Sequence, residues 1–122
     1  MKQHKILVID DEKEICSLLK SYFEDEGYAV HCSYDGEEGL KQVKSFDPSI
    51  ILLDIRMPGM SGLEVLKKIK ELTSAPVLCV SAMVDNEMVA ECLKNGAFAY
   101  ILKPVDLKGL NESIQTALKE QP

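Results

Sequence analysis

The chain has 122 residues, of which 46% are hydrophobic and 28% are charged, and its formal net charge at pH 7 is -6. This length and composition are typical of one globular domain over residues 1–122, and they exclude disordered and fibrous classes. The negative charge argues against direct nucleic-acid binding, because lysine and arginine supply most of the affinity for phosphate backbones. The apolar runs are too short for a membrane span and no signal peptide precedes the first of them, so we expect a cytoplasmic protein with no membrane contact.

Apolar runs of strand length alternate five times with stretches of helical periodicity. In chain order, the pattern predicts a strand over 6–9, a helix over 13–26, a strand over 28–32, a helix from Asp35 to about Asp47, a strand over 49–53, a helix from Ser61, a strand over 76–80, a helix ending at Asn95, a strand over 98–102 and a last helix after Asp106. This alternation is typical of a parallel sheet covered by helices on both faces.

Several residues fit helix ends. Gly27 can stop the first helix, and Asp35 can cap the second. Ser61 and Glu64 have the spacing of a capping box, and Asp106 can cap the last helix. The four cysteines are widely spaced and form no zinc-binding pattern, so we expect them to pack in the core.

Polar residues stand where the predicted strands end: Asp10, Asp11, Asp54, Ser81 and Lys103. The carboxyl ends of parallel strands meet at one edge of the sheet, where ligands of such proteins bind. These residues could simply cap the strands, but five of them at one edge favour a functional site.

Three carboxylates at one edge destabilise a fold unless a cation offsets their repulsion. Mg²⁺ prefers carboxylates, waters and phosphate oxygens, so we expect Asp11 and Asp54 to bind it directly, with Asp10 nearby or acting through water. Lys103 supplies a second positive charge. An aspartate whose negative charge is offset by Mg²⁺ and a lysine can accept a phosphoryl group, and Asp54 is the candidate. Ser81 can then donate a hydrogen bond to a phosphoryl oxygen and draw its loop toward Asp54.

These motifs resemble the signature of response regulator receiver domains. The signature covers almost the whole chain and consists of Asp10-Asp11, Asp54 followed by Met57-Pro58-Gly59, Ser81-Ala82, Tyr100 and Lys103-Pro104. The resemblance implies a flavodoxin-like (βα)5 three-layer sandwich with strand order 2-1-3-4-5, the order found in a chemotaxis member of the family. It also implies a cis peptide bond between Lys103 and Pro104.

In the family, a histidine kinase or a histidine phosphotransfer protein donates the phosphoryl group. The resemblance implies that Asp54 accepts it and that Asp11, Asp54 and the backbone carbonyl of Arg56 bind Mg²⁺. It further implies that Ser81 moves toward the phosphoryl group and that Tyr100 turns inward. These movements remodel the face made by the fourth helix, the fifth strand and the fifth helix, which controls a downstream protein or a fused effector domain. Such a domain catalyses only its own phosphorylation and dephosphorylation.

Two variable positions of the family tune how long the phosphoryl group lasts, and here they hold Arg56 and Met83. Neither side chain offers an acceptor that orients a water molecule for in-line attack. We therefore expect slow self-catalysed hydrolysis.

Four alternatives can be compared with this interpretation. A haloacid-dehalogenase-like phosphatase needs a second aspartate two residues after its nucleophile, where this chain has Arg56. A flavodoxin-like FMN protein needs a hydroxyl-rich or glycine-rich phosphate loop after the first strand, where this chain has Asp10 and Asp11. A degenerate receiver would lack the acids, lysine and hydroxyl found here. Whether the chain is a stand-alone receiver or part of a longer transcriptional regulator is left open, as is a phosphorylation-dependent dimer.

Overall fold

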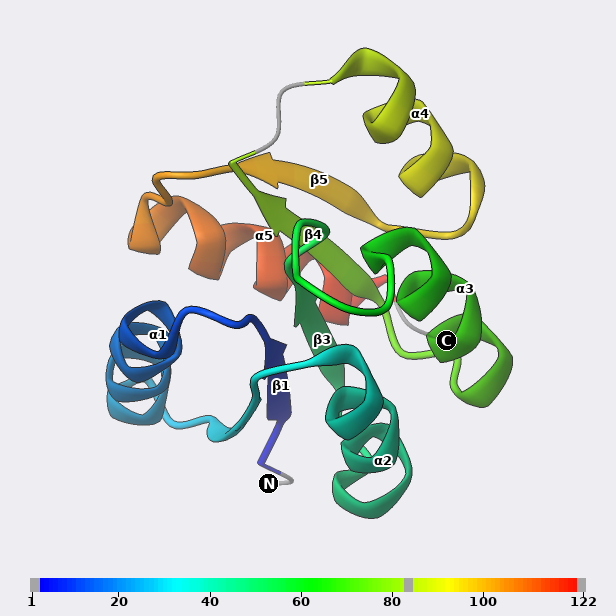
Figure 1. The fold of residues 1–122 in the computed structure, drawn as a ribbon. Coiled ribbons are helices and arrows are strands. Elements are labelled where there is room, and N and C mark those ends of the chain that lie inside the picture. Colours follow the sequence, from blue (N-terminus) through cyan, green and yellow to red (C-terminus); the bar gives the residue numbers. More distant parts are fainter. Residues whose placement is uncertain (1–2, 83–84, 121–122) are drawn as a thin grey trace.

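The computed structural model describes residues 3–82 and 85–120, in which strands and helices alternate along the chain (Figure 1). The strands are β1 (Lys5–Ile9), β2 (Ala29–Ser33), β3 (Ile50–Leu53), β4 (Val77–Ser81) and β5 (Ala99–Leu102). The helices are α1 (Lys13–Asp25), α2 (Gly36–Phe46), α3 (Gly62–Leu72), α4 (Asn86–Lys94) and α5 (Leu107–Lys119). The predicted alternation of five strands and five helices is therefore confirmed.

The five strands form one parallel sheet in the order β2-β1-β3-β4-β5. β1 lies between β2 and β3, and its Ile9 pairs with Ser33 on one side and with Leu53 on the other. The central strands are buried on both faces, which explains why they read in the sequence as continuous apolar runs. The predicted fold class and strand order are both confirmed.

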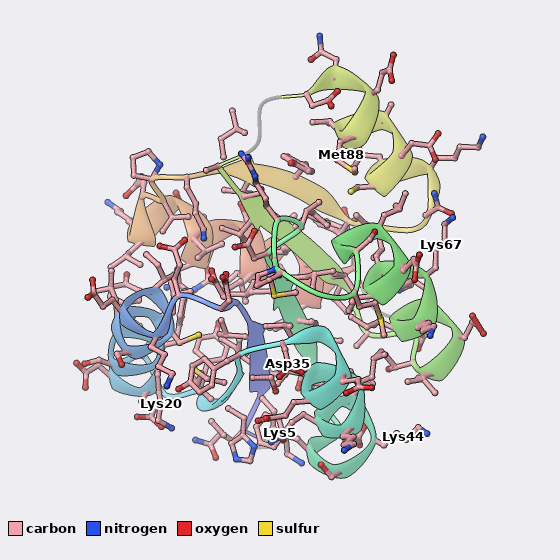
Figure 2. The ribbon with its side chains drawn as sticks, in the orientation of Figure 1. Lys5, Lys20, Asp35, Lys44, Lys67 and Met88 are labelled. Atoms are coloured by element: carbon pink, nitrogen blue, oxygen red, sulfur yellow. The ribbon has the colours of Figure 1, made fainter. Side chains whose placement is uncertain are left out.

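The helices cover the two faces of the sheet in two groups, as Figure 1 shows. α1 and α5 pack on one face, where Phe23 and Ile114 are fully buried against β1, β3 and β4. α2, α3 and α4 pack on the other face, where Ile69 and Cys92 are fully buried. Lysines such as Lys44 of α2 and Lys67 of α3 point away from the sheet on the outside of this layer (Figure 2). The core therefore consists of two apolar layers separated by the sheet.

Local capping explains where several helices begin and end. Asp35 accepts a hydrogen bond from the backbone N–H of Glu38 at 2.8 Å, and Ser61 accepts one from Glu64 at 3.3 Å, as predicted. Gly27 follows Glu26, the C-cap of α1, and has a positive φ of 98°, which only glycine adopts without strain. The prediction for Asp106 was wrong in part, because it occupies the N-cap position of α5 but its side chain makes no capping hydrogen bond.

Each of the five predicted strands differs from the observed strand by one residue: the first starts one residue earlier, the third and fifth start one residue later, and the second and fourth shift by one residue at both ends. β2 covers 29–33 instead of 28–32, because its register with β1 starts at the pair Lys5 and Ala29. β4 continues to Ser81, which still pairs with Leu102 and so lies inside the strand rather than after it. The peptide bond between Lys103 and Pro104 is cis, as expected.

The four cysteines are free thiols, and the expected core packing is confirmed, because even Cys32 packs against the core layer that contains Cys16. Cys16, Cys79 and Cys92 are fully buried, whereas Cys32 is half-buried.

None of the helices described in residues 3–82 and 85–120 is long and apolar enough to cross a membrane.

Candidate functional site

Four adjacent strands bring the predicted polar residues to one edge of the sheet. Asp10 and Asp54 directly follow β1 and β3, Ser81 ends β4, and Lys103 directly follows β5. Backbone hydrogen bonds continue the sheet pairing into these positions, from the N–H of Asp54 to Ile9 at 2.9 Å and from the N–H of Lys103 to Ser81 at 2.9 Å. The sheet register therefore fixes where each side chain starts.

Asp10 and Asp54 are arranged in the same way. In each, Oδ1 accepts a hydrogen bond at 2.9 Å from the backbone N–H two residues later, that of Glu12 for Asp10 and that of Arg56 for Asp54. This is the local side-chain turn that aspartate favours. The other oxygen of each carboxylate, Oδ2, faces Lys103. The strand ends thus hold two carboxylates in matching orientations toward one cation.

Lys103 contacts three carboxylates. Its Nζ lies 2.9 Å from Oδ2 of Asp10, 3.0 Å from Oε1 of Glu12 and 3.2 Å from Oδ2 of Asp54. An ammonium group has three donors, so each can serve one of these acceptors. The side chains of Asp10 and Asp54 are buried, whereas that of Glu12 is 58% exposed. The lysine offsets the negative charge that the fold concentrates at this edge.

Burial and charge shift the pKa values of both partners. Burial raises the pKa of Asp10 above its ordinary value, because the charged form loses hydration, and the hydrogen bonds from Lys103 and Glu12 offset only part of this effect. Burial alone would lower the pKa of Lys103, but its contacts with Asp10 and Glu12 outweigh burial and raise that pKa. Lys103 is therefore charged at neutral pH.

Glu12 is a member of the site that sequence reasoning missed. Carboxylate oxygens of Asp10, Glu12 and Asp54 all lie within 4.8 Å of one another, whereas Asp11 is exposed and is not part of this group. The missed signal is the acidic run Asp10-Asp11-Glu12, in which the turn after the strand decides which side chains face the site. The set of oxygen donors suits a hard divalent cation such as Mg²⁺.

Ser81 and Tyr100 lie on the same face of the sheet, toward α4. Tyr100 is half-buried against the apolar layer that contains Cys79 and Cys92, and it shares a side-chain hydrogen bond with Ser81. Burial raises the pKa of Tyr100, and the bond to Ser81 opposes this rise. Met88 of α4 packs against the same layer and lies on the side of α4 that faces the sheet (Figure 2). The hydroxyl of Ser81 is therefore linked to the α4 face through Tyr100.

Comparison with known protein families agrees with this geometry. The sequence model of the response regulator receiver domain matches residues 6–115. The chain belongs to this family. It is a receiver domain of the type found in two-component response regulators.

This receiver domain is similar to parts of longer regulatory proteins. It is 37% identical over 119 residues to the regulatory protein AtoC of Escherichia coli, covering 97% of this chain and 26% of AtoC. It is 34% identical over 118 residues to the response regulator ArlR of Staphylococcus aureus, covering 97% of this chain and 54% of ArlR. The chain thus spans about a quarter to about half of these relatives. A CheY-like receiver domain from Methanospirillum hungatei has a TM-score of 0.95 at 33% identity, with 98% of this chain and 96% of that one covered.

The loop after Asp54 is shaped by a close approach between Gly62 and Ile55. A Cβ atom on Gly62 would collide with the backbone of Ile55, so the start of α3 can lie against the loop only because residue 62 is glycine. The N–H of Arg56 donates to Asp54 within this loop. Met83, the second of the two residues that we expect to tune phosphoryl lifetime, lies outside the described residues of the receiver domain.

Proposed function

We propose that Asp54 accepts a phosphoryl group in a Mg²⁺-dependent reaction and that this modification switches the domain. The donor is a sensor histidine kinase or a histidine phosphotransfer protein. The observation that carries the proposal is the contact of 3.2 Å between Nζ of Lys103 and Oδ2 of Asp54, a buried carboxylate at a strand end. Phosphoryl transfer depends mostly on positioning and on stabilising charge, and this contact provides a fixed cation beside the acceptor.

In the proposed reaction, a carboxylate oxygen of Asp54 attacks phosphorus. A new O–P bond forms while the N–P bond of the donor histidine breaks, and the histidine nitrogen keeps the bonding electrons. Lys103 now donates one hydrogen bond to Asp54, and after the transfer it can donate that bond to a phosphoryl oxygen instead. Its hydrogen bonds to Asp10 and Glu12 can stay in place.

Mg²⁺, when bound, would supply charge neutralisation between the carboxylates and the incoming phosphoryl oxygens. Asp10 and Asp54 would hold it, together with Asp11 and the backbone carbonyl of Arg56 as the family implies. Asp11 is exposed in the structure, and its side chain would have to turn toward the site to serve as a ligand.

The output of the switch would begin at Ser81. A hydrogen bond from its hydroxyl to a charged phosphoryl oxygen contributes roughly 1.5–3 kcal/mol, which is enough to bias a two-state equilibrium. Ser81 and Tyr100 interact through their side chains, so movement of Ser81 toward the phosphoryl group would change the surroundings of Tyr100. The face formed by α4, β5 and α5 would change and so control a downstream partner or a fused effector domain.

A phosphorylation assay tests the proposal. The protein is incubated with Mg²⁺ and acetyl phosphate, and its intact mass is measured. We expect one added phosphoryl group in the wild type, and none in Asp54→Ala or in metal-free buffer. Asp25→Ala removes an exposed aspartate at the end of α1 and should behave as the wild type. Retention of the added mass in Asp54→Ala would show that another residue is the acceptor.

A further inference from the structure

Glu12 differs from the other two carboxylates on Lys103 in its exposure. The side chains of Asp10 and Asp54 are 4% and 5% exposed, whereas that of Glu12 is 58% exposed, although all three carboxylates lie within 3.2 Å of Nζ. Glu12 therefore holds the outer side of the ammonium group, toward solvent.

The backbone places Glu12 for this contact. It occupies the N-cap position of α1, where a side chain commonly accepts a hydrogen bond from the first turn, yet its carboxylate makes no such bond. Its N–H instead donates to Oδ1 of Asp10 at 2.9 Å, and its carboxylate reaches Lys103, 91 residues away in the sequence. The carboxylate of Glu12 thus accepts a hydrogen bond from Lys103 and does not cap α1.

Lys103 and a divalent cation require the same buried oxygens. Lys103 contacts one carboxylate oxygen of Asp10 and one of Asp54, and these two buried residues form, together with the exposed Glu12, the acidic group that suits a metal ion. Two cations close together repel each other. Glu12 offers the ammonium group an acceptor that belongs to neither buried aspartate.

We propose that Glu12 is a positioning residue that holds Lys103 beside the acidic site and so limits its competition with Mg²⁺; this inference rests on the proposed function. Loss of the Glu12 carboxylate has two effects of the same sign. It removes a negative charge near the metal, and it leaves Lys103 with only Asp10 and Asp54 among its three observed carboxylate partners. Both effects weaken Mg²⁺ binding.

The test is direct titration of Mg²⁺ by calorimetry, in 0.15 M salt where long-range charge effects are screened beyond about 8 Å. Glu12→Gln keeps the size of the side chain and should raise the Mg²⁺ dissociation constant about two- to fivefold, as expected for an exposed carboxylate. Glu14→Gln makes the same change of charge on an exposed residue of α1 that is not among the three carboxylates observed on Lys103. Its dissociation constant should match that of the wild type.

A second pair of proteins separates positioning from charge alone. In a Lys103→Met background, Glu12→Gln removes only the direct effect of the Glu12 carboxylate on the metal, so its effect on Mg²⁺ binding should be smaller than in the wild type. An equal effect in both backgrounds would overturn the positioning role. So would identical Mg²⁺ affinities of Glu12→Gln and wild type, an outcome that leaves the proposed function intact. Absence of Mg²⁺ binding by the wild type would overturn both proposals.

Discussion

The ammonium of Lys103 lies 3.2 Å from Oδ2 of Asp54, although 49 residues separate them in the sequence. Both residues directly follow a strand of the same parallel sheet, and β4 lies between these two strands. The sheet therefore places a fixed positive charge beside the proposed phosphoryl acceptor before any reaction takes place.

Replacement of Lys103 by methionine tests how strongly this charge stabilises the fold. Asp10 and Asp54 would stay buried without their shared cation, so we expect the free energy of unfolding in metal-free buffer to fall by about 3 kcal/mol. Urea unfolding followed by circular dichroism measures the loss. Lys67→Met removes an exposed lysine of α3 and should change stability by less than about 0.5 kcal/mol. Equal losses in the two variants would contradict a special role for Lys103.

Mg²⁺ should stabilise the native protein. A ligand that binds only the folded state at ten times its dissociation constant adds about 1.4 kcal/mol to the free energy of unfolding. We expect this gain in the wild type, and a much smaller one in Asp54→Asn, which replaces one of the close carboxylates by an amide. Thermal unfolding with and without MgCl₂, at matched ionic strength, gives the comparison. A gain of the same size in Asp54→Asn would place the ion elsewhere.

The stability of the metal-free protein should depend on the ionisation of Asp10. Burial raises the pKa of Asp10 in the folded state, so its charged form is disfavoured by folding. This unfavourable contribution is present at pH values above the folded pKa and disappears as the pH falls toward the unfolded value. Asp10→Asn should therefore be more stable than the wild type at pH 7, and the difference should shrink as the pH falls toward 4. Urea unfolding of both proteins with EDTA measures it, and a difference that grows with acidification would refute the assignment.

Gly62 should tolerate no side chain. Gly62→Ala brings a Cβ into the backbone of Ile55, which cannot move aside as a flexible side chain can, and we expect a loss of about 3 kcal/mol or more in the free energy of unfolding. Gly109 is also in a helix, but the atoms nearest to a Cβ there belong to the side chain of Asp106, the closest at 3.0 Å. Gly109→Ala should therefore cost far less, and it can gain from the higher helix propensity of alanine. Equal effects in chemical denaturation would mean that the start of α3 can shift.

The phosphoryl group on Asp54 should be long-lived. Arg56 and Met83 provide no acceptor to orient an attacking water, so Arg56→Asn combined with Met83→Glu should speed the loss of the phosphoryl group on the order of tenfold or more. The measurement is the decay of phosphorylated protein by intact mass after removal of acetyl phosphate. Lys67→Met serves as a control with unchanged decay. Unchanged decay in the double variant would refute the role of these positions.

Much of the fold and part of the candidate site could be predicted from the sequence. Strands buried on both faces must be continuously apolar, so the runs at Ile6–Ile9 and Ile50–Leu53 identify themselves, and the first polar residue after each marks where the chain leaves the core. Asp35 and Ser61 were predicted as helix caps because a cap depends on residues three apart in the chain.

The tertiary structure decided which side chains meet. Glu12 reaches Lys103 while its neighbour Asp11 is exposed, and Ser81 bonds with Tyr100. Neither contact could be predicted from the spacing of residues along the chain. The direction of a side chain in a turn depends on the backbone around it and on partners that the sheet brings close. Amino-acid order determined the strands, the helices and the acidic character of the edge; only the packed structure determined which three carboxylates share one lysine.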